Sequence, residues 1–299
     1  MPTTMLKAFN NTVLQEIHYA AWQEKGVLVS VLRDDLIHPY MSGNKWRKLK
    51  YNILDFNNSG KKVLVTFGGA FSNHLIAVAA ASAEFSFESI GIVRGEEVNN
   101  PYLNFVKQKG MKLLFISRED YRNKKETASK IFDLLLSKGW IHSKEDVFLL
   151  PEGGANLAAV KGSSEIIDDI SIAFDWIACA CGTGATLAGI SQKLSGKQKA
   201  LGIPVLKANG YMGKEIEKLG GLKNKIELNE KYHFGGYAKK NESLDFFCKD
   251  FSSTTGIPIE PVYTGKLFYA LDDLIKMNYF KKGEKVTAIH TGGVFNFPN

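Results

Sequence analysis

The sequence predicts an α/β protein in which helices cover open parallel sheets. Short runs rich in β-branched and aromatic residues alternate with longer amphipathic segments over residues 61–290. The run at 176–180 (WIACA) has small or branched side chains throughout, which is typical of a strand buried on both faces. Four of the expected strands end in glycine turns. With 299 residues the chain can form one large or two ordinary domains.

The expected strands are short apolar runs bounded by turn residues. They cover 61–67, 89–95, 112–118, 147–150, 176–180, 203–207, 226–231 and 286–290. The expected helices have apolar residues at helical spacing and cover 72–85, 100–110, 119–139, 156–169, a segment from about 185, 242–256 and 266–277. Asn100 and Gly110 mark the start and the end of the second helix. No Pro/Ser-rich linker divides the chain, so compact connections must cross any domain boundary.

Composition excludes several classes of function. The net charge of +7 comes from 38 basic and 31 acidic residues that are interleaved, and no nucleic-acid-binding motif is visible, so we expect no nucleic-acid partner. The sequence has no run of 18 apolar residues, so we expect no membrane span. Residues 1–10 lack the charged and then apolar order of a signal peptide, so we expect a cytoplasmic protein. Cys179 and Cys181 lie in an expected buried strand and are interpreted as core; no metal site is expected.

The glycine turns point to a ligand site. They lie in 65–73, 149–156, 180–189 and 289–296, and a fifth lies in 233–237. In an open parallel sheet the ligand crevice is at the carboxyl ends of the strands, where glycine lets the backbone approach a ligand. One such turn is usually only a tight turn, but several at equivalent strand ends favour a site.

The turn at 182–186 has the strongest ligand signal. Gly182, Thr183, Gly184, Ala185 and Thr186 follow a buried strand and open a helix, so backbone N–H groups and two hydroxyls could bind a phosphate. The pattern is neither a P-loop nor a dinucleotide fingerprint, which favours a single phosphate. The alternative is a turn that is merely built of small residues.

Two further segments suit anions and amines. Ser72 or Asn73 would cap a helix whose start could hold a carboxylate, and capping does not explain His74. Lys45 lies at an expected helix start, where the positive end of the helix dipole lowers the pKa of an amine. A neutral amine is what bonding to an aldehyde requires, although a basic surface helix is the simpler alternative.

The motifs GNKWRKL, GGAFSNH, EGGAN, CGTGATLAG, VYTGK and HTGG, in this order, resemble pyridoxal-phosphate enzymes of the tryptophan synthase β fold (fold type II). Among them the chain resembles the 1-aminocyclopropane-1-carboxylate deaminase/D-cysteine desulfhydrase family. The resemblance spans about 45–295. It implies two α/β domains of open twisted parallel sheets: a large cofactor-binding domain, 1–46 plus 152–299, and a small one, 47–151. It also implies a homodimer.

The resemblance assigns roles to individual residues. Lys45 would form the Schiff base with pyridoxal 5'-phosphate, and Lys48 would bind the phosphate with the 183–186 loop. Ser72, Asn73 and His74 would hold the carboxylate of a small amino-acid substrate, with Asn73 also at the cofactor's 3-oxygen. Tyr263 and Tyr237 would face the substrate. The α-proton would be removed by Lys45, Ser72 or Tyr263.

Two cofactor-binding positions, Thr264 and Thr291, separate members of that family. The deaminases resemble a pattern with Glu and Leu there, whereas the threonine pair accompanies D-cysteine desulfhydrases. A hydroxyl at the ring nitrogen would leave it neutral and make a weaker electron sink than a carboxylate. We therefore expect β-elimination of D-cysteine to pyruvate, ammonia and sulfide. The alternatives are deamination of 1-aminocyclopropane-1-carboxylate to 2-oxobutanoate and ammonia, elimination or racemisation of another small amino acid, and cofactor binding without turnover.

Overall fold

The structure, a computed structural model, describes residues 11–124 and 126–297. These residues form two compact units. The smaller unit comprises 49–155 with 296–297, and the larger unit comprises 11–48 and 156–295. The first ten residues, on which the expectation about a signal peptide depends, lie outside the described part. None of the helices within the described ranges has the length and apolar character that crossing a bilayer requires.

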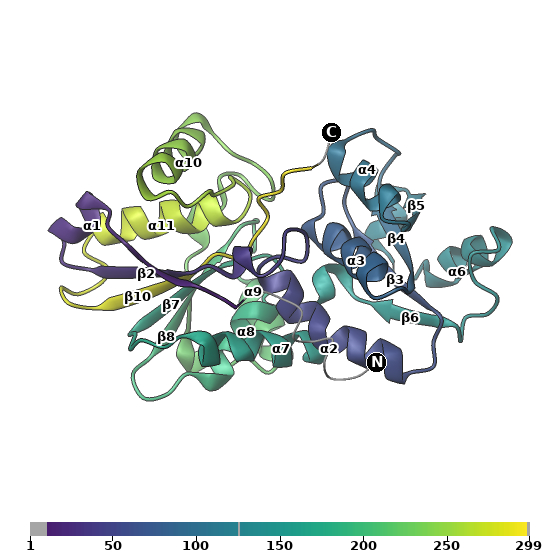
Figure 1. The fold of residues 1–299 in the computed structure, drawn as a ribbon, viewed down its shortest axis with the longest axis horizontal. Helices are drawn as coiled ribbons and strands as arrows, with labels where there is room; N and C mark the ends of the chain where they lie inside the picture. Colours follow the sequence, from purple (N-terminus) through teal and green to yellow (C-terminus); the bar gives the residue numbers. More distant parts are fainter. Residues whose placement is uncertain (1–10, 125, 298–299) are drawn as a thin grey trace. The chain divides into compact units, whose positions relative to one another are not determined.

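The smaller unit is a four-stranded parallel sheet in the order β5-β4-β3-β6 (Figure 1). Its strands are β3 (Val63–Gly68), β4 (Glu88–Arg94), β5 (Lys112–Ile116) and β6 (Val147–Leu150). Its helices are α3 (Asn73–Glu84), α4 (Pro101–Gln108), α5 (Arg118–Arg122) and α6 (Ala128–Ser137). Alternate residues of β3 face opposite sides: Val65 joins the core cluster that contains Ile131 of α6, whereas Thr66 contacts α3.

The larger unit has a six-stranded sheet in the order β1-β2-β10-β7-β8-β9. Its strands are β1 (Leu14–Ile17), β2 (Leu28–Leu32), β7 (Trp176–Cys181), β8 (Lys199–Pro204), β9 (Ile226–Leu228) and β10 (Lys285–Ile289). Only β1, at one edge of this sheet, runs antiparallel to its neighbour. Because β10 pairs with both β2 and β7, the last strand joins the N-terminal hairpin to the rest of the sheet.

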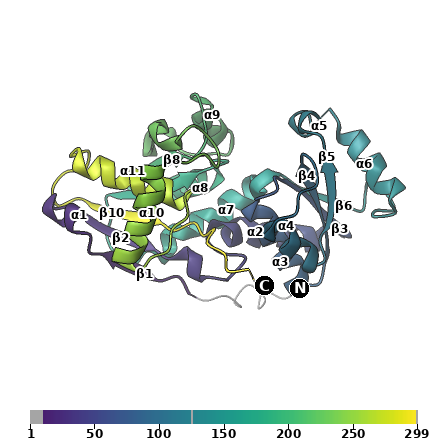
Figure 2. The ribbon, with the colours of Figure 1, turned by 90° about the horizontal axis from the view of Figure 1, so that it is seen from above.

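Helices cover both faces of this sheet (Figures 1 and 2). One face carries α1 (Ala20–Glu24), α10 (Glu242–Thr255) and α11 (Thr264–Lys276). The other carries α7 (Leu157–Ser164) and α8 (Ala185–Lys193), and α9 (Tyr211–Lys218) packs on α8. Helix α2 (Asn44–Asn58) begins in the larger unit and continues into the smaller one. Single 3-10 turns occupy Asp34–Leu36, Glu152–Gly154, Glu165–Asp169, Lys223–Lys225 and Glu230–His233.

The predicted α/β class with parallel sheets is confirmed, and four expected elements are wrong in extent. The strand expected near 226–231 ends at Leu228, and a 3-10 turn follows over Glu230–His233. The helix expected over 119–139 is two helices, because the intervening residues include no apolar side chain that could pack on the sheet. The strand expected over 203–207 lies at 199–204 and pairs with β7 and β9. The helix expected over 156–169 ends at Ser164 and continues as a 3-10 turn.

Candidate active site

The turn that precedes α2 packs against the last glycine turn of the chain. Gly43 has a φ of +61°, and a Cβ built on it would lie 2.1 Å from the carbonyl atoms of Thr291. A Cβ on Gly292 would likewise lie 2.4 Å from Ser42 Oγ. Only glycine allows this close approach with a left-handed backbone. Two motifs almost 250 residues apart in the sequence are therefore parts of one site.

Lys45 lies in the first turn of α2 and is linked to the predicted phosphate loop through Asn44. Its Nζ donates a hydrogen bond to Asn44 Oδ1 at 2.7 Å. Asn44 Nδ2 in turn donates to Thr186 Oγ1 at 3.0 Å. Asn44 is buried and bonded to both residues, so it fixes the position of the lysine amine relative to the loop. Asn44, which directly precedes the predicted lysine, was not itself predicted as a site residue.

The loop between β7 and α8 has the form of an anion site. Gly184 precedes α8 with a φ of +81°, and no side chain caps this helix. The buried ammonium of Lys48 donates to Thr183 Oγ1 at 3.3 Å. A helix start and a cation that meet at one loop favour a bound anion. The structure thus places Lys48 at the loop of Thr183, Gly184, Ala185 and Thr186, and their binding of a phosphate stays a prediction.

Burial makes both lysine amines easier to deprotonate. Burial, together with the positive charge of Lys48, lowers the pKa of Lys45 to about 7. Burial also lowers the pKa of Lys48 to about 8. A group in a low-dielectric environment resists charging. The main cause is therefore burial rather than the helix dipole invoked from the sequence, and the result is the same: near pH 7 a large fraction of Lys45 is the neutral amine.

Two tyrosines lie beside Lys45. Its Nζ is 5.6 Å from the centroid of the Tyr263 ring. The Tyr263 and Tyr237 hydroxyls are 3.4 Å apart, and the two rings meet edge-on with centroids at 5.9 Å. A Cβ on Gly182 would lie 3.3 Å from the Tyr263 ring, so the glycine leaves space for that ring. The predicted pair of substrate-facing tyrosines thus stands at the lysine and the loop.

Thr264 and Thr291, the two threonines that the resemblance assigns to the cofactor, are both buried. Thr264 opens α11, and Thr291 follows β10 and packs against Gly43. Between Thr291 and the strand lies His290, whose Nε2 is 2.7 Å from the Pro258 carbonyl oxygen. Burial lowers the pKa of His290.

Ser72, Asn73 and His74 belong to the smaller unit, at the start of α3. Ser72 caps the helix by accepting a hydrogen bond from the Leu75 backbone N–H at 3.3 Å, one of the two capping residues that we expected. The His74 ring is buried, and its Nε2 is 2.8 Å from Thr66 Oγ1. Thr66 also donates to the Leu150 carbonyl oxygen at 2.9 Å, so His74 is tied to β3 and β6. Their predicted contact with a substrate carboxylate stays a prediction.

Two charged residues of the site were missed from the sequence. Glu260 places its carboxylate at the start of α11, where it accepts from the backbone N–H of Tyr263 at 2.9 Å. Lys266 is fully buried and donates to the carbonyl oxygens of Val205, His233 and Gly236 at 3.0, 2.9 and 2.8 Å. It therefore fastens the glycine turn that carries Tyr237. Both residues lie in the segment IEPVYTGK, from which only the tyrosine and the threonine were predicted as site residues.

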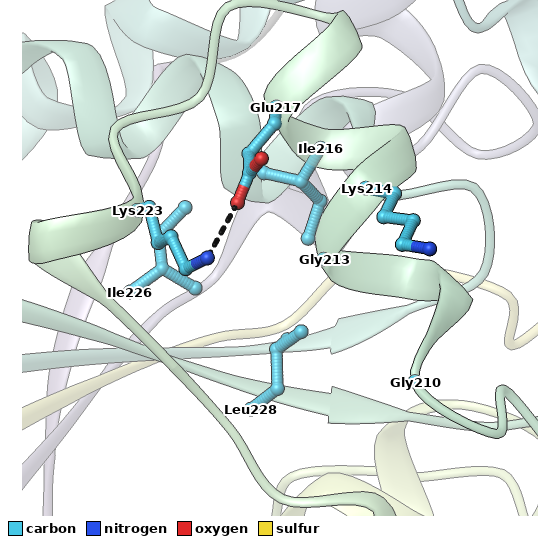
Figure 3. A pocket seen from close by; sticks show the side chains of 8 residues that line it. All are labelled: Gly210, Gly213, Lys214, Ile216, Glu217, Lys223, Ile226 and Leu228. Atoms are coloured by element: carbon cyan, nitrogen blue, oxygen red, sulfur yellow. Dashed lines mark ion pairs between the residues drawn. The ribbon is translucent and has the colours of Figure 1, made fainter.

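A separate cavity of about 380 Å³ lies between α9 and β9 (Figure 3). Its lining includes Leu228 and the ion pair of 3.3 Å between Glu217 and Lys223. It contains none of the predicted site residues. One of its walls, Ile216, would contact a Cβ on Gly184 at 2.6 Å, so this wall supports the back of the phosphate loop.

The residues of the larger unit fit a phosphorylated aldehyde. The ammonium of Lys48, two threonine hydroxyls and an uncapped helix start match a phosphate dianion. The Lys45 amine, with its lowered pKa, is suited to form a covalent bond with an aldehyde carbon. A fold of parallel sheets with these two features is typical of enzymes that depend on a phosphorylated aldehyde cofactor.

Comparison with known proteins agrees with this class. The model of the family described as pyridoxal-phosphate dependent enzymes matches residues 6–292. A Pyrococcus furiosus protein, provisionally named 1-aminocyclopropane-1-carboxylate deaminase, is 34% identical over 90% of this chain and 85% of its own. A mitochondrial protein of Arabidopsis thaliana, named bifunctional D-cysteine desulfhydrase/1-aminocyclopropane-1-carboxylate deaminase, is 28% identical over 90% of this chain and 73% of its own.

A solved structure described as an ACC deaminase homologue superposes with a TM-score of 0.80. It is 28% identical and covers 95% of this chain and 90% of its own. The chain belongs to the pyridoxal-phosphate dependent enzyme family, with fold type II architecture, and its relatives include 1-aminocyclopropane-1-carboxylate deaminase and D-cysteine desulfhydrase.

Proposed function

We propose that this enzyme deaminates 1-aminocyclopropane-1-carboxylate to 2-oxobutanoate and ammonia. The main support for this class of reaction is a chain of hydrogen bonds that joins Lys45 through Asn44 to Thr186. Lys48 donates a hydrogen bond to Thr183 of the same loop. The names of the relatives support the substrate. The interpretation from sequence put D-cysteine first and this reaction second, and the relatives favour the second.

Each residue has a chemical task in this proposal. Bound pyridoxal phosphate supplies an aldehyde for amines and a conjugated ring that withdraws electrons from the substrate's Cα. Lys45 would hold the aldehyde carbon, and its amine would move a proton at a substrate carbon. Lys48, Thr183 and Thr186 would bind the phosphate. Because Asn44 accepts from the Lys45 amine, it aims the nitrogen lone pair.

The substrate would be small. Tyr263 and Tyr237 would bound the space beside Lys45 and exclude long side chains. The assignment of Ser72, Asn73 and His74 to the substrate carboxylate comes from the resemblance, and the start of α3 supplies the backbone N–H groups that such a role needs.

The cyclopropane substrate has no hydrogen on Cα, so its reaction must break a carbon–carbon bond. This requires stronger withdrawal of electrons than loss of sulfide from D-cysteine does. D-cysteine desulfhydration is the second candidate, and Thr264 and Thr291 favour it, since the family's desulfhydrases share this threonine pair.

A substrate panel tests the proposal. The purified enzyme, loaded with pyridoxal phosphate, is incubated with the cyclopropane amino acid, D-cysteine and L-cysteine, and 2-oxobutanoate, pyruvate, sulfide and ammonia are measured. We expect 2-oxobutanoate and ammonia in equal amounts from the first substrate, and none from the Lys45→Ala variant, which also controls for reactions of free cofactor. Pyruvate and sulfide from D-cysteine without 2-oxobutanoate would reject the proposal in favour of the second candidate. No 2-oxo acid from any amino acid would indicate a protein that only binds the cofactor.

A further inference from the structure

The carboxylate of Glu260 is fixed in place by the start of α11. It accepts hydrogen bonds from the backbone N–H groups of Val262, Tyr263 and Thr264 at 2.7, 2.9 and 2.9 Å. These bonds stabilise a negative charge, as does the positive end of the helix dipole. The carboxylate is thus held beside the threonine that the resemblance assigns to the cofactor's ring nitrogen.

The hydroxyl of Thr264 both accepts a hydrogen bond from Glu260 and donates one to it. It accepts from the Glu260 backbone N–H at 3.0 Å. Its own proton can go to Glu260 Oε1 at 3.3 Å or to the Glu260 carbonyl oxygen at 3.4 Å. A hydroxyl has one proton and two lone pairs. What remains for a ligand is therefore one lone pair, which can only accept a hydrogen bond.

An acceptor at the ring nitrogen requires a proton on that nitrogen. This reverses the argument made from sequence, in which a threonine hydroxyl leaves the nitrogen neutral. We propose that Glu260 is a positioning residue that, through the Thr264 hydroxyl, keeps the ring nitrogen of the bound cofactor protonated. The inference deepens the proposed function, on which its relevance to ring opening rests, because a protonated nitrogen gives the stronger electron sink.

The charges around Glu260 are compatible with this role. Burial raises the pKa of Glu260 to about 7, against the three backbone bonds that lower it. Its negative charge partly offsets the burial that lowers the pKa values of Lys45 and Lys266. The same charge helps to raise the pKa of the Cys248 thiol of α10. A cationic N–H placed on Thr264 would favour the ionised form of Glu260, so the two groups would share one proton over the neutral pH range.

The test reads the nitrogen directly, without substrate. Enzyme loaded with pyridoxal phosphate that carries ¹⁵N in its ring is titrated by NMR between pH 6 and 9, and the ¹⁵N shift reports the protonated fraction. We expect the ring nitrogen of the wild type to be protonated at neutral pH. In Glu260→Gln the protonated fraction should be at least tenfold lower, whereas Glu260→Asp, which keeps the carboxylate, should keep the nitrogen protonated. Glu242→Gln removes an exposed carboxylate from the first turn of α10 and should match the wild type.

A folded, cofactor-loaded Glu260→Gln with the wild-type titration would overturn the proposal. If that variant does not fold, Thr264→Val serves instead, because it removes the relay and keeps the carboxylate; retention of the nitrogen proton in it would equally overturn the proposal. The result is independent of turnover. An enzyme that acts on neither proposed substrate, yet loses the nitrogen proton on Glu260→Gln, would reject the proposed function and support this inference.

Discussion

Replacing Lys266 with methionine tests whether a buried ammonium holds the tyrosine-bearing turn in place. Methionine has a similar length and no donor, so the change removes three hydrogen bonds to main-chain carbonyl oxygens, those of Val205, His233 and Gly236. The Lys266 side chain is fully buried, so water does not replace these bonds without rearrangement.

The magnitude follows from two opposing effects. A buried carbonyl oxygen that loses its donor costs about 1–3 kcal/mol, so three of them cost about 6 kcal/mol at mid-range. Removing the ammonium also removes its burial penalty. Burial lowers the pKa of Lys266 from 10.5 to about 8, which corresponds to about 3 kcal/mol. We therefore expect Lys266→Met to lower the free energy of unfolding of the larger unit by about 3 kcal/mol.

Urea unfolding followed by tryptophan fluorescence measures this loss, because Trp22, Trp46 and Trp176 all lie in the larger unit. Lys218→Met is the control: it lies on α9 of the same unit, its side chain is 70% exposed, and it pairs with Glu215, itself 45% exposed, at 2.5 Å. Such a surface pair contributes about 1 kcal/mol or less. If Lys266→Met lies within 1 kcal/mol of this control, the three hydrogen bonds contribute nothing net and the reasoning fails.

Three further predictions concern the lysines and the turn before α2. Because the pKa of Lys45 is about 7, the rate at which apoenzyme captures pyridoxal phosphate should rise up to about pH 7 and then level off, measured by stopped-flow absorbance; a rise only near pH 10 would contradict this. Lys48→Met should weaken cofactor binding about tenfold or more in equilibrium dialysis, whereas Lys50→Met on the same helix should not. Gly43→Ala should cost more than about 2 kcal/mol in thermal unfolding, because its Cβ meets backbone at 2.1 Å, whereas Gly60→Ala, with φ +69° and open space, should cost about 1.

Local patterns predicted the parts of the site that are made locally. The loop 182–186 was recognisable because a buried strand, a glycine turn and a helix start follow one another directly, and β7, Gly184 and α8 form in that order. Ser72 was predictable as a cap for the same reason. In each case the determining interactions lie within a few residues of one another.

Elements that depend on distant pairing were predicted less well. The strand β8 was expected at 203–207, but its position is set by pairing with β7 and β9 over Lys199–Pro204. The hairpin of β1 and β2 was not anticipated. Four residues, LQEI, make β1, which pairs with β2 alone among the described strands, and so short a segment shows too little hydrophobic alternation to be predicted.

Glu260 shows why the substrate could not be argued from one position. The resemblance implies a glutamate at position 264 in the deaminases, and from the threonine present here we expected a weak electron sink. A hydroxyl acts according to what it is bonded to: bonded to a carboxylate at 3.3 Å and to a backbone donor at 3.0 Å, Thr264 has only an acceptor to offer. A carboxylate four residues before the expected position can therefore have the same electrostatic effect at the ring. Because the field at a buried site is the sum over all groups around it, the threonine pair alone does not decide between sulfide elimination and ring opening.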